Sequence, residues 1–195
     1  MKGERSMNLP NKLTVLRVLF IPVIMVFLLF EGIPFRWLLG GLCFGAASLT
    51  DMFDGRIARK RNLITDFGKL MDPVADKMLV MSTLICFVQS GICGAWVVVV
   101  ILFREFLVTS MRMIAADKGK VIAANIWGKI KTVTQMIAII GIFCSKAAGE
   151  FAFIPSFVGE WLLIVSFVVL YAAVAATIFS GARYMYDARE FFREM

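Results

Sequence analysis

The apolar runs of this chain constrain its fold more than any other feature. Of its 195 residues, 60% are apolar, and this proportion lies outside the usual range of soluble domains. A helix needs roughly 20 apolar residues to cross about 30 Å of hydrocarbon, and the alternating pattern of a membrane β-barrel is absent. The sequence therefore predicts an all-α integral membrane protein with six transmembrane helices in one domain, residues 1–195. The predicted helices cover residues 13–30, 36–54, 70–90, 94–114, 132–147 and 160–182.

Basic residues are distributed unevenly between the connections. Lysine and arginine gather after the second and fourth runs and in the C-terminal tail, whereas the loops on the other side carry only Arg36 and Lys146. The positive-inside rule therefore places both termini on the cytoplasmic side of the membrane. The net charge of +7 also favours anionic lipid headgroups or phosphate-bearing substrates as partners. Nucleic acid is not a predicted partner, because no basic stripe is interleaved with aromatic residues.

The chain contains no histidine, which limits its chemistry. Any acid–base catalysis must use carboxylates, lysine or tyrosine. The four cysteines lie within or at the edges of apolar runs without C-x-x-C spacing, and we interpret them as small core residues.

Four aspartates lie at or near the ends of two apolar runs. Asp51 and Asp54 are three residues apart, and Asp72 and Asp76 are four apart, so each pair shares one face of a helix. If the two helices run antiparallel across the basic turn at 60–65, the pairs meet at the cytoplasmic surface. Four carboxylates so close repel one another unless cations intervene. The sequence therefore predicts that two divalent cations, which prefer oxygen ligands, neutralise these carboxylates. Two cations so bound form the arrangement used for displacement at phosphorus.

Small residues and an arginine separate the two aspartate pairs. Gly55 and Ala58 leave room for a bulky ligand to approach, and Arg59 offers a bidentate fork suited to phosphate. Gly68 lies one turn before Asp72 and admits either close helix packing or a ligand. The alternative is that the glycines serve only helix packing and that the charges are solvated turn residues.

The pattern D-x-x-D-G-x-x-A-R, eight residues, G-x-x-x-D-x-x-x-D resembles the signature of the CDP-alcohol phosphatidyltransferase family, and every fixed position matches. The resemblance implies a six-helix membrane fold with a site facing the cytoplasm, in a homodimer. It also implies that an alcohol attacks the β-phosphorus of a CDP-linked lipid and that CMP leaves, with Asp76 as general base. Two Mg²⁺ or Mn²⁺ ions would be held by Asp51, Asp54, Asp72 and Asp76, and the CDP pocket would be lined by Gly55, Ala58, Arg59, Thr65 and Gly68.

The acceptor alcohol has to be identified outside this signature. Arg104 and Arg112 are eight residues apart in the fourth run, hence on nearly one face, and Lys129 and Lys131 follow in the segment GKIKT. Such cations suit an acceptor that carries its own phosphate dianion. The alternative for Arg104 is a structural ion pair involving Glu105.

Secondary segments resemble bacterial members of the family that join CDP-diacylglycerol to glycerol 3-phosphate in the cytoplasmic membrane. These are NLPNKLTVLR at 8–17, DPVADK at 72–77, RE at 104–105 and GKIKT at 128–132. Asn11 and Thr14 are candidates to contact the nucleotide or the acceptor, or else to cap the first helix. Arg17 either reaches the site or extends to lipid headgroups.

Three other functions fit parts of the pattern. Another family member would use inositol phosphate, serine or phosphatidylglycerol as the acceptor. An Mg-dependent intramembrane prenyltransferase also binds diphosphate through aspartates, but its aspartate motifs lie far apart in sequence. A cation transporter or channel would leave Gly55, Ala58 and Arg59 unexplained.

Overall fold

The structure is a computed structural model that describes residues 9–61, 66–117 and 126–193. These residues form six α-helices and no strand, which confirms the predicted all-α class, and each predicted apolar run corresponds to one helix. The helices are α1 (Leu9–Leu29), α2 (Arg36–Arg61), α3 (Asp66–Gln89), α4 (Ala95–Asp117), α5 (Ile126–Ala148) and α6 (Ser156–Arg193).

Several helices extend beyond the apolar runs that predicted them. Helix α2 continues to Arg61, seven residues past its run, and α6 continues to Arg193, so that its 38 residues span about 57 Å. An apolar run marks the hydrocarbon-facing part of a helix, whereas the backbone hydrogen bonds continue after the side chains become charged. Within the extension of α6, the Arg189 guanidinium lies 3.9 Å from the centroid of the Tyr186 ring, one turn earlier.

Three of the described helices are long and apolar enough to cross a membrane by length and composition. They are the segments Asn11–Leu29, Ile130–Ala148 and Ser156–Tyr186. Helices α3 and α4 are of similar length but carry several charged side chains in their middle turns, among them Lys77 and Arg104. The chain is therefore a membrane protein with several candidate spans, and the charges of α3 and α4 need partners inside the bundle.

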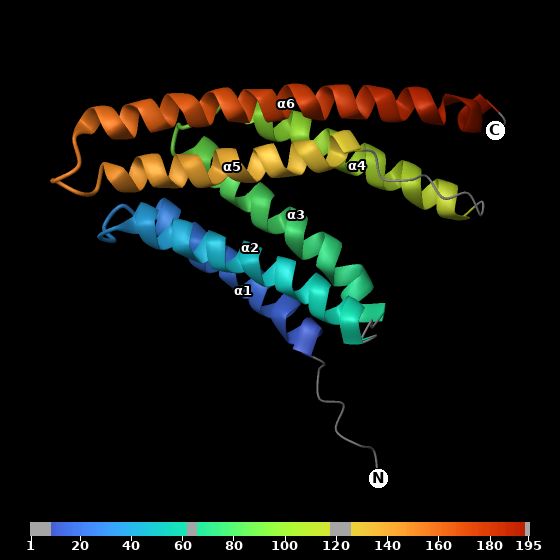
Figure 1. Cartoon of the computed structure of the whole chain (residues 1–195), viewed down its shortest axis with the longest axis horizontal. Helices are drawn as coiled ribbons and strands as arrows, with labels where there is room; N and C mark the ends of the chain where they lie inside the picture. The colour runs from blue at the N-terminus through green and yellow to red at the C-terminus, as the bar shows by residue number, and fades with distance from the viewer. Residues whose placement is uncertain (1–8, 62–65, 118–125, 194–195) are drawn as a thin grey trace, which may run out of the picture.

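The helices pack as two connected groups. Helix α1 packs against α2 and α3, α5 packs along α6, and α2 with α5 joins the two groups. Figure 1 shows the α1–α2 and α5–α6 connections at one end of the bundle, and the C-terminal ends of α2, α4 and α6 toward the other. The two aspartate-bearing segments, at the end of α2 and the start of α3, lie together at this second end.

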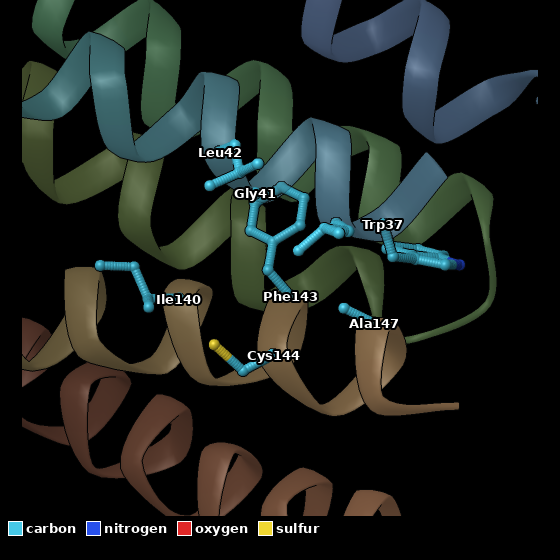
Figure 2. Close-up of a pocket in the computed structure, with 8 residues that line it drawn as sticks. Trp37, Gly41, Leu42, Ile140, Phe143, Cys144 and Ala147 are labelled. Carbon is cyan, nitrogen blue, oxygen red and sulfur yellow. The ribbon is translucent and has the colours of Figure 1, made fainter. Parts of the chain in front are cut away.

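An aromatic core fills the bundle near the α1–α2 connection. The ring of Phe143 on α5 lies 5.7 Å from Phe44 of α2, 5.3 Å from Phe87 of α3 and 6.4 Å from Trp37, measured between centroids. Beside it a pocket of about 220 Å³ opens between α2 and α5 (Figure 2), lined by apolar side chains and Cys144. Because its lining holds no charged group, this pocket is not a candidate site for a phosphate.

Candidate functional site

Thr14 connects α1 to the aspartates of α3. Its side chain is buried, and its hydroxyl donates a hydrogen bond of 2.5 Å to Oδ1 of Asp72. Asp76 lies one turn further along α3, on the same face as Asp72. Thr14 lies five residues inside the described part of α1, so it does not cap this helix, and the structure brings it to the aspartate site instead.

Asn11 and Arg17 lie on α1 one turn to either side of Thr14. Both are buried, and Arg17 is 0% exposed. Asn11 is within α1 and is not its N-cap. Because the Arg17 side chain is enclosed by protein, the alternative in which it extends to lipid headgroups is wrong. The face of α1 that contacts α3 is therefore polar near the aspartates.

The remaining signature residues can be placed only by their helices. Asp51, Asp54, Gly55, Ala58 and Arg59 fall in the last turns of α2, and Gly68 falls in the first turn of α3. Their side chains are outside the described set, and Thr65 lies outside the described residues altogether. Helix α2 ends at Arg61 and α3 begins at Asp66, so the two aspartate pairs flank one short connection, as predicted. Among the side chains that are described, no group of three or more acids, histidines or cysteines could hold a metal ion.

A cluster of charged side chains forms around Glu105 of α4. Its Oε1 accepts hydrogen bonds from Nη1 of Arg104 at 2.9 Å and from the Lys131 ammonium of α5. Arg104 also donates from Nη2 to Oγ of Ser180 on α6, at 2.7 Å. The side chain of Lys131 is only 4% exposed. The structure thus brings together two of the four predicted acceptor-binding cations, and the ion pair proposed as an alternative for Arg104 is part of the same cluster.

Lys77 joins this cluster to the aspartate helix. Its Nζ lies 3.9 Å from Oε2 of Glu105 and donates a hydrogen bond of 2.6 Å to Oγ1 of Thr109 on α4. Lys77 directly follows Asp76 in α3, so their Cα atoms are about 3.8 Å apart. The cationic cluster therefore includes the residue that follows the candidate general base on α3.

Arg112 is not part of this cluster. It lies two turns beyond Arg104 on α4, where its Nε donates a hydrogen bond of 3.2 Å to the Tyr184 hydroxyl and its guanidinium lies over that ring at 5.6 Å. The side chain of Lys129 is outside the described set. Of the three predicted acceptor-binding side chains that the structure describes, it therefore unites Arg104 and Lys131.

Sequence reasoning assigned no role to Lys77, Thr109, Ser180 or Tyr184. For Lys77 a signal was present, because a cation inside an apolar run is a functional candidate by default. The hydroxyl groups carried no such signal. Their importance depends on which helices pack together, and spacing along one helix does not reveal it.

Comparisons with known proteins identify the family of the chain. The model of the family described as CDP-alcohol phosphatidyltransferase matches residues 7–179. A Bacillus subtilis (strain 168) protein named CDP-diacylglycerol–glycerol-3-phosphate 3-phosphatidyltransferase is 41% identical, over 91% of this chain and 93% of its own. Proteins of the same name from Rickettsia bellii and Haemophilus influenzae are 37% and 33% identical, over 95% and 93% of this chain and 97% and 94% of their own. The chain belongs to the CDP-alcohol phosphatidyltransferase family.

Proposed function

We propose that this protein transfers the phosphatidyl group of CDP-diacylglycerol to glycerol 3-phosphate, giving phosphatidylglycerophosphate and CMP in phospholipid biosynthesis. The names of relatives that align over more than 90% of the chain support this reaction. The single structural observation that carries it is the cationic cluster around Glu105, which includes Lys77, the residue after Asp76, because a phosphate on the acceptor needs such a site. Serine carries no phosphate, so the cluster favours a phosphorylated acceptor over serine.

Four aspartates would provide the metal site. Carboxylate oxygens are the ligands that Mg²⁺ and Mn²⁺ prefer, and the chain offers no histidine in their place. Asp51 and Asp54 on α2 and Asp72 and Asp76 on α3 would hold two such ions, with the Asp72 carboxylate oriented by Thr14. When bound, the ions would neutralise the diphosphate and stabilise the charge on departing CMP.

Asp76 would take the proton of the attacking alcohol. The hydroxyl oxygen of the acceptor forms a bond to the β-phosphorus, the bond from this phosphorus to the bridging oxygen breaks, and CMP leaves with that oxygen. The hydroxyl proton passes to the Asp76 carboxylate. The CDP pocket would be lined by Gly55, Ala58, Arg59, Thr65 and Gly68, and Asn11 and Thr14 would complete it from α1. The acceptor phosphate would lie near Arg104 and Lys131. Two further cations, Lys129 and Arg112, would lie at the edge of this acceptor site.

We place the whole chain, residues 1–195, in the bacterial cytoplasmic membrane as one domain with six spans. All three connections on the side away from the aspartates are poor in basic residues, which favours cytoplasmic termini and a cytoplasmic site. Helices α3 and α4 would cross the bilayer with their ionic side chains paired inside the bundle, Lys77 of α3 and Arg104 of α4 each with Glu105.

An acceptor assay tests the proposed reaction. The purified protein would receive CDP-diacylglycerol, Mg²⁺ and one acceptor at a time, namely glycerol 3-phosphate, inositol phosphate, serine or phosphatidylglycerol, and CMP release would be measured. We expect release with glycerol 3-phosphate and only background with the Asp76→Asn variant. Failure to use glycerol 3-phosphate, with release from another acceptor, would assign the chain to a different reaction within the family.

We also propose that the protein is a homodimer, as the family resemblance implies. The G-x-x-x-G spacing of Gly41 and Gly45 does not by itself support this, because Gly41 already packs against the Phe143 ring of the same chain. Light scattering corrected for detergent should give twice the chain mass of 21.8 kDa. The mass of a single chain would contradict the proposal.

A further inference from the structure

The Glu105 carboxylate contacts three cations. It is largely buried and faces Lys77 from α3, Arg104 from its own helix and Lys131 from α5. Three helices are therefore connected through one side chain. A purely structural ion pair would need one cation, whereas this carboxylate has three.

The cluster carries more positive than negative charge. Lys77, Arg104 and Lys131 contribute three positive charges and Glu105 one negative charge, which leaves a surplus of two among these four described groups. Isolated charge inside a membrane bundle is costly, so a surplus of this kind favours the binding of an anion. A phosphate monoester, which carries nearly two negative charges at neutral pH, has the matching charge.

Arg104 also retains an unused donor. Its Nε is buried and has no hydrogen-bond partner among the described atoms, although both Nη atoms are bonded. The side chain is held closely on two sides. A Cβ built on Gly181 of α6 would lie 3.2 Å from its Cγ, and one built on Gly128 of α5 would lie 3.4 Å from Nη2. A rigidly held guanidinium with a spare buried donor is typical of an anion site.

We propose that Glu105 is a positioning residue for the acceptor. Its carboxylate holds the Lys131 ammonium and the Arg104 guanidinium close together. Its single negative charge leaves the cluster with two surplus positive charges, which a phosphate monoester dianion neutralises. This inference rests on the proposed function and deepens it. Glu105 itself does not contact the acceptor and acts through the two cations.

Steady-state kinetics of four proteins test the proposal: the wild type, Glu105→Gln, Lys131→Gln and the double variant. Loss of a charge-assisted hydrogen bond in a buried site should raise the KM for glycerol 3-phosphate about tenfold in each single variant. The KM for CDP-diacylglycerol and kcat at saturation should stay near the wild-type values. Because Glu105 acts in part through Lys131, the rise in KM of the double variant should be smaller than the product of the two single rises. Glu105→Asp should recover part of the loss.

A charge-selectivity measurement adds an independent arm. The methyl ester of glycerol 3-phosphate carries one negative charge, so the wild type should strongly prefer the unmodified acceptor. Lys131→Gln lowers the surplus to one and should narrow that preference. Glu150→Gln removes a carboxylate charge near the other end of the bundle and serves as the matched control. Its KM values for glycerol 3-phosphate and for CDP-diacylglycerol should equal those of the wild type.

The outcomes separate the competing explanations. An unchanged KM for glycerol 3-phosphate in Glu105→Gln, an equal rise in both KM values, or multiplicative losses in the double variant would overturn the positioning role. If Glu105→Gln does not fold, Glu105→Asp and the selectivity of Lys131→Gln decide the question. If the wild type releases no CMP with glycerol 3-phosphate, the proposed function fails and this inference fails with it.

Discussion

Thr14 reaches from α1 to Asp72 of α3, and this contact orients a carboxylate of the proposed metal site. The buried Thr14 hydroxyl donates to Oδ1 of Asp72 at 2.5 Å. Hydrogen-bond partners of metal ligands typically contribute about 10- to 100-fold in metal affinity. Thr14→Val should therefore raise the Mg²⁺ concentration needed for half-maximal CMP release by about tenfold. The measurement is a Mg²⁺ titration at saturating substrates.

Thr83→Val provides the matched control for Thr14. Thr83 is also buried, but its hydroxyl donates to the Leu79 carbonyl of its own helix, at 2.9 Å. The same loss of a hydroxyl should leave the Mg²⁺ dependence unchanged. Equal Mg²⁺ dependence in both variants and the wild type would remove Thr14 from the site.

Asp76→Asn separates proton transfer from binding. The amide keeps the size of the side chain but cannot accept the proton of the acceptor hydroxyl. We expect CDP-diacylglycerol and the metal still to bind in part, while CMP release falls to background. Equilibrium binding of the lipid and a CMP assay measure the two effects, and near-wild-type turnover would exclude Asp76 as the base.

The sequence contained the aspartates but not their partners. Asp51, Asp54, Asp72 and Asp76 are recognisable because a fixed spacing along helices defines them. The hydrogen bond between Thr14 and Asp72 joins residues 58 positions apart, and Lys131 meets Glu105 across 26 positions. Such contacts depend on how helices pack, which no periodicity within one helix records.

At the scale of the helices, α2 receives an N-terminal cap from a distant connection. Glu150, which follows α5, accepts hydrogen bonds from the backbone N–H groups of Trp37 at 3.0 Å and Leu38 at 3.2 Å. A carboxylate at this end accepts hydrogen bonds from backbone N–H groups that have no partner within the helix. Its negative charge also interacts favourably with the positive end of the helix dipole. Glu150→Ala should therefore lower the free energy of unfolding by about 1 kcal/mol, as typical N-cap losses do.

Glu31→Ala is the control for this prediction. Glu31 pairs with Arg36 at 3.6 Å, but its side chain is 87% exposed, and ion pairs of this kind contribute little. Thermal unfolding in one detergent should show a lower melting temperature for Glu150→Ala than for the wild type. The melting temperature of Glu31→Ala should be unchanged. Equal melting temperatures in both variants would show that the cap does not stabilise α2.

The helix boundaries show what hydropathy can predict. Six apolar runs correctly predicted six helices, and three of the described helices are long and apolar enough to cross a membrane. They did not predict that α6 extends to Arg193, because its last turns carry arginine and tyrosine and lie past the apolar segment. The role of Glu150 as a cap was equally hidden, since the sequence places it only in a loop.

At the scale of the whole molecule, the close packing of α5 along α6 depends on small residues. A Cβ built on Gly141 of α5 would lie 2.3 Å from Oγ of Ser166 on α6, and the Ser145 hydroxyl of α5 donates to the Gly159 carbonyl at 2.7 Å. Small residues that let backbones approach are the usual means of helix association in membranes. This pair of helices also carries Lys131 and Ser180, so its packing supports the cationic cluster.

The orientation of the molecule in the membrane is the broadest prediction. The α5–α6 connection, residues 149–155, is poor in basic residues and should face away from the cytoplasm, whereas the arginine-rich end of α6 should face it. Phe153 is 80% exposed in that connection, and Arg189 is exposed near the end of α6. In a chain whose four native cysteines are replaced by alanine, Phe153→Cys should react with a membrane-impermeant maleimide in intact cells. Arg189→Cys should react only after the membrane is permeabilised. The reverse labelling pattern would mean that the proposed site faces the outside of the cell, where CDP-diacylglycerol and acceptor from the cytoplasm cannot reach it.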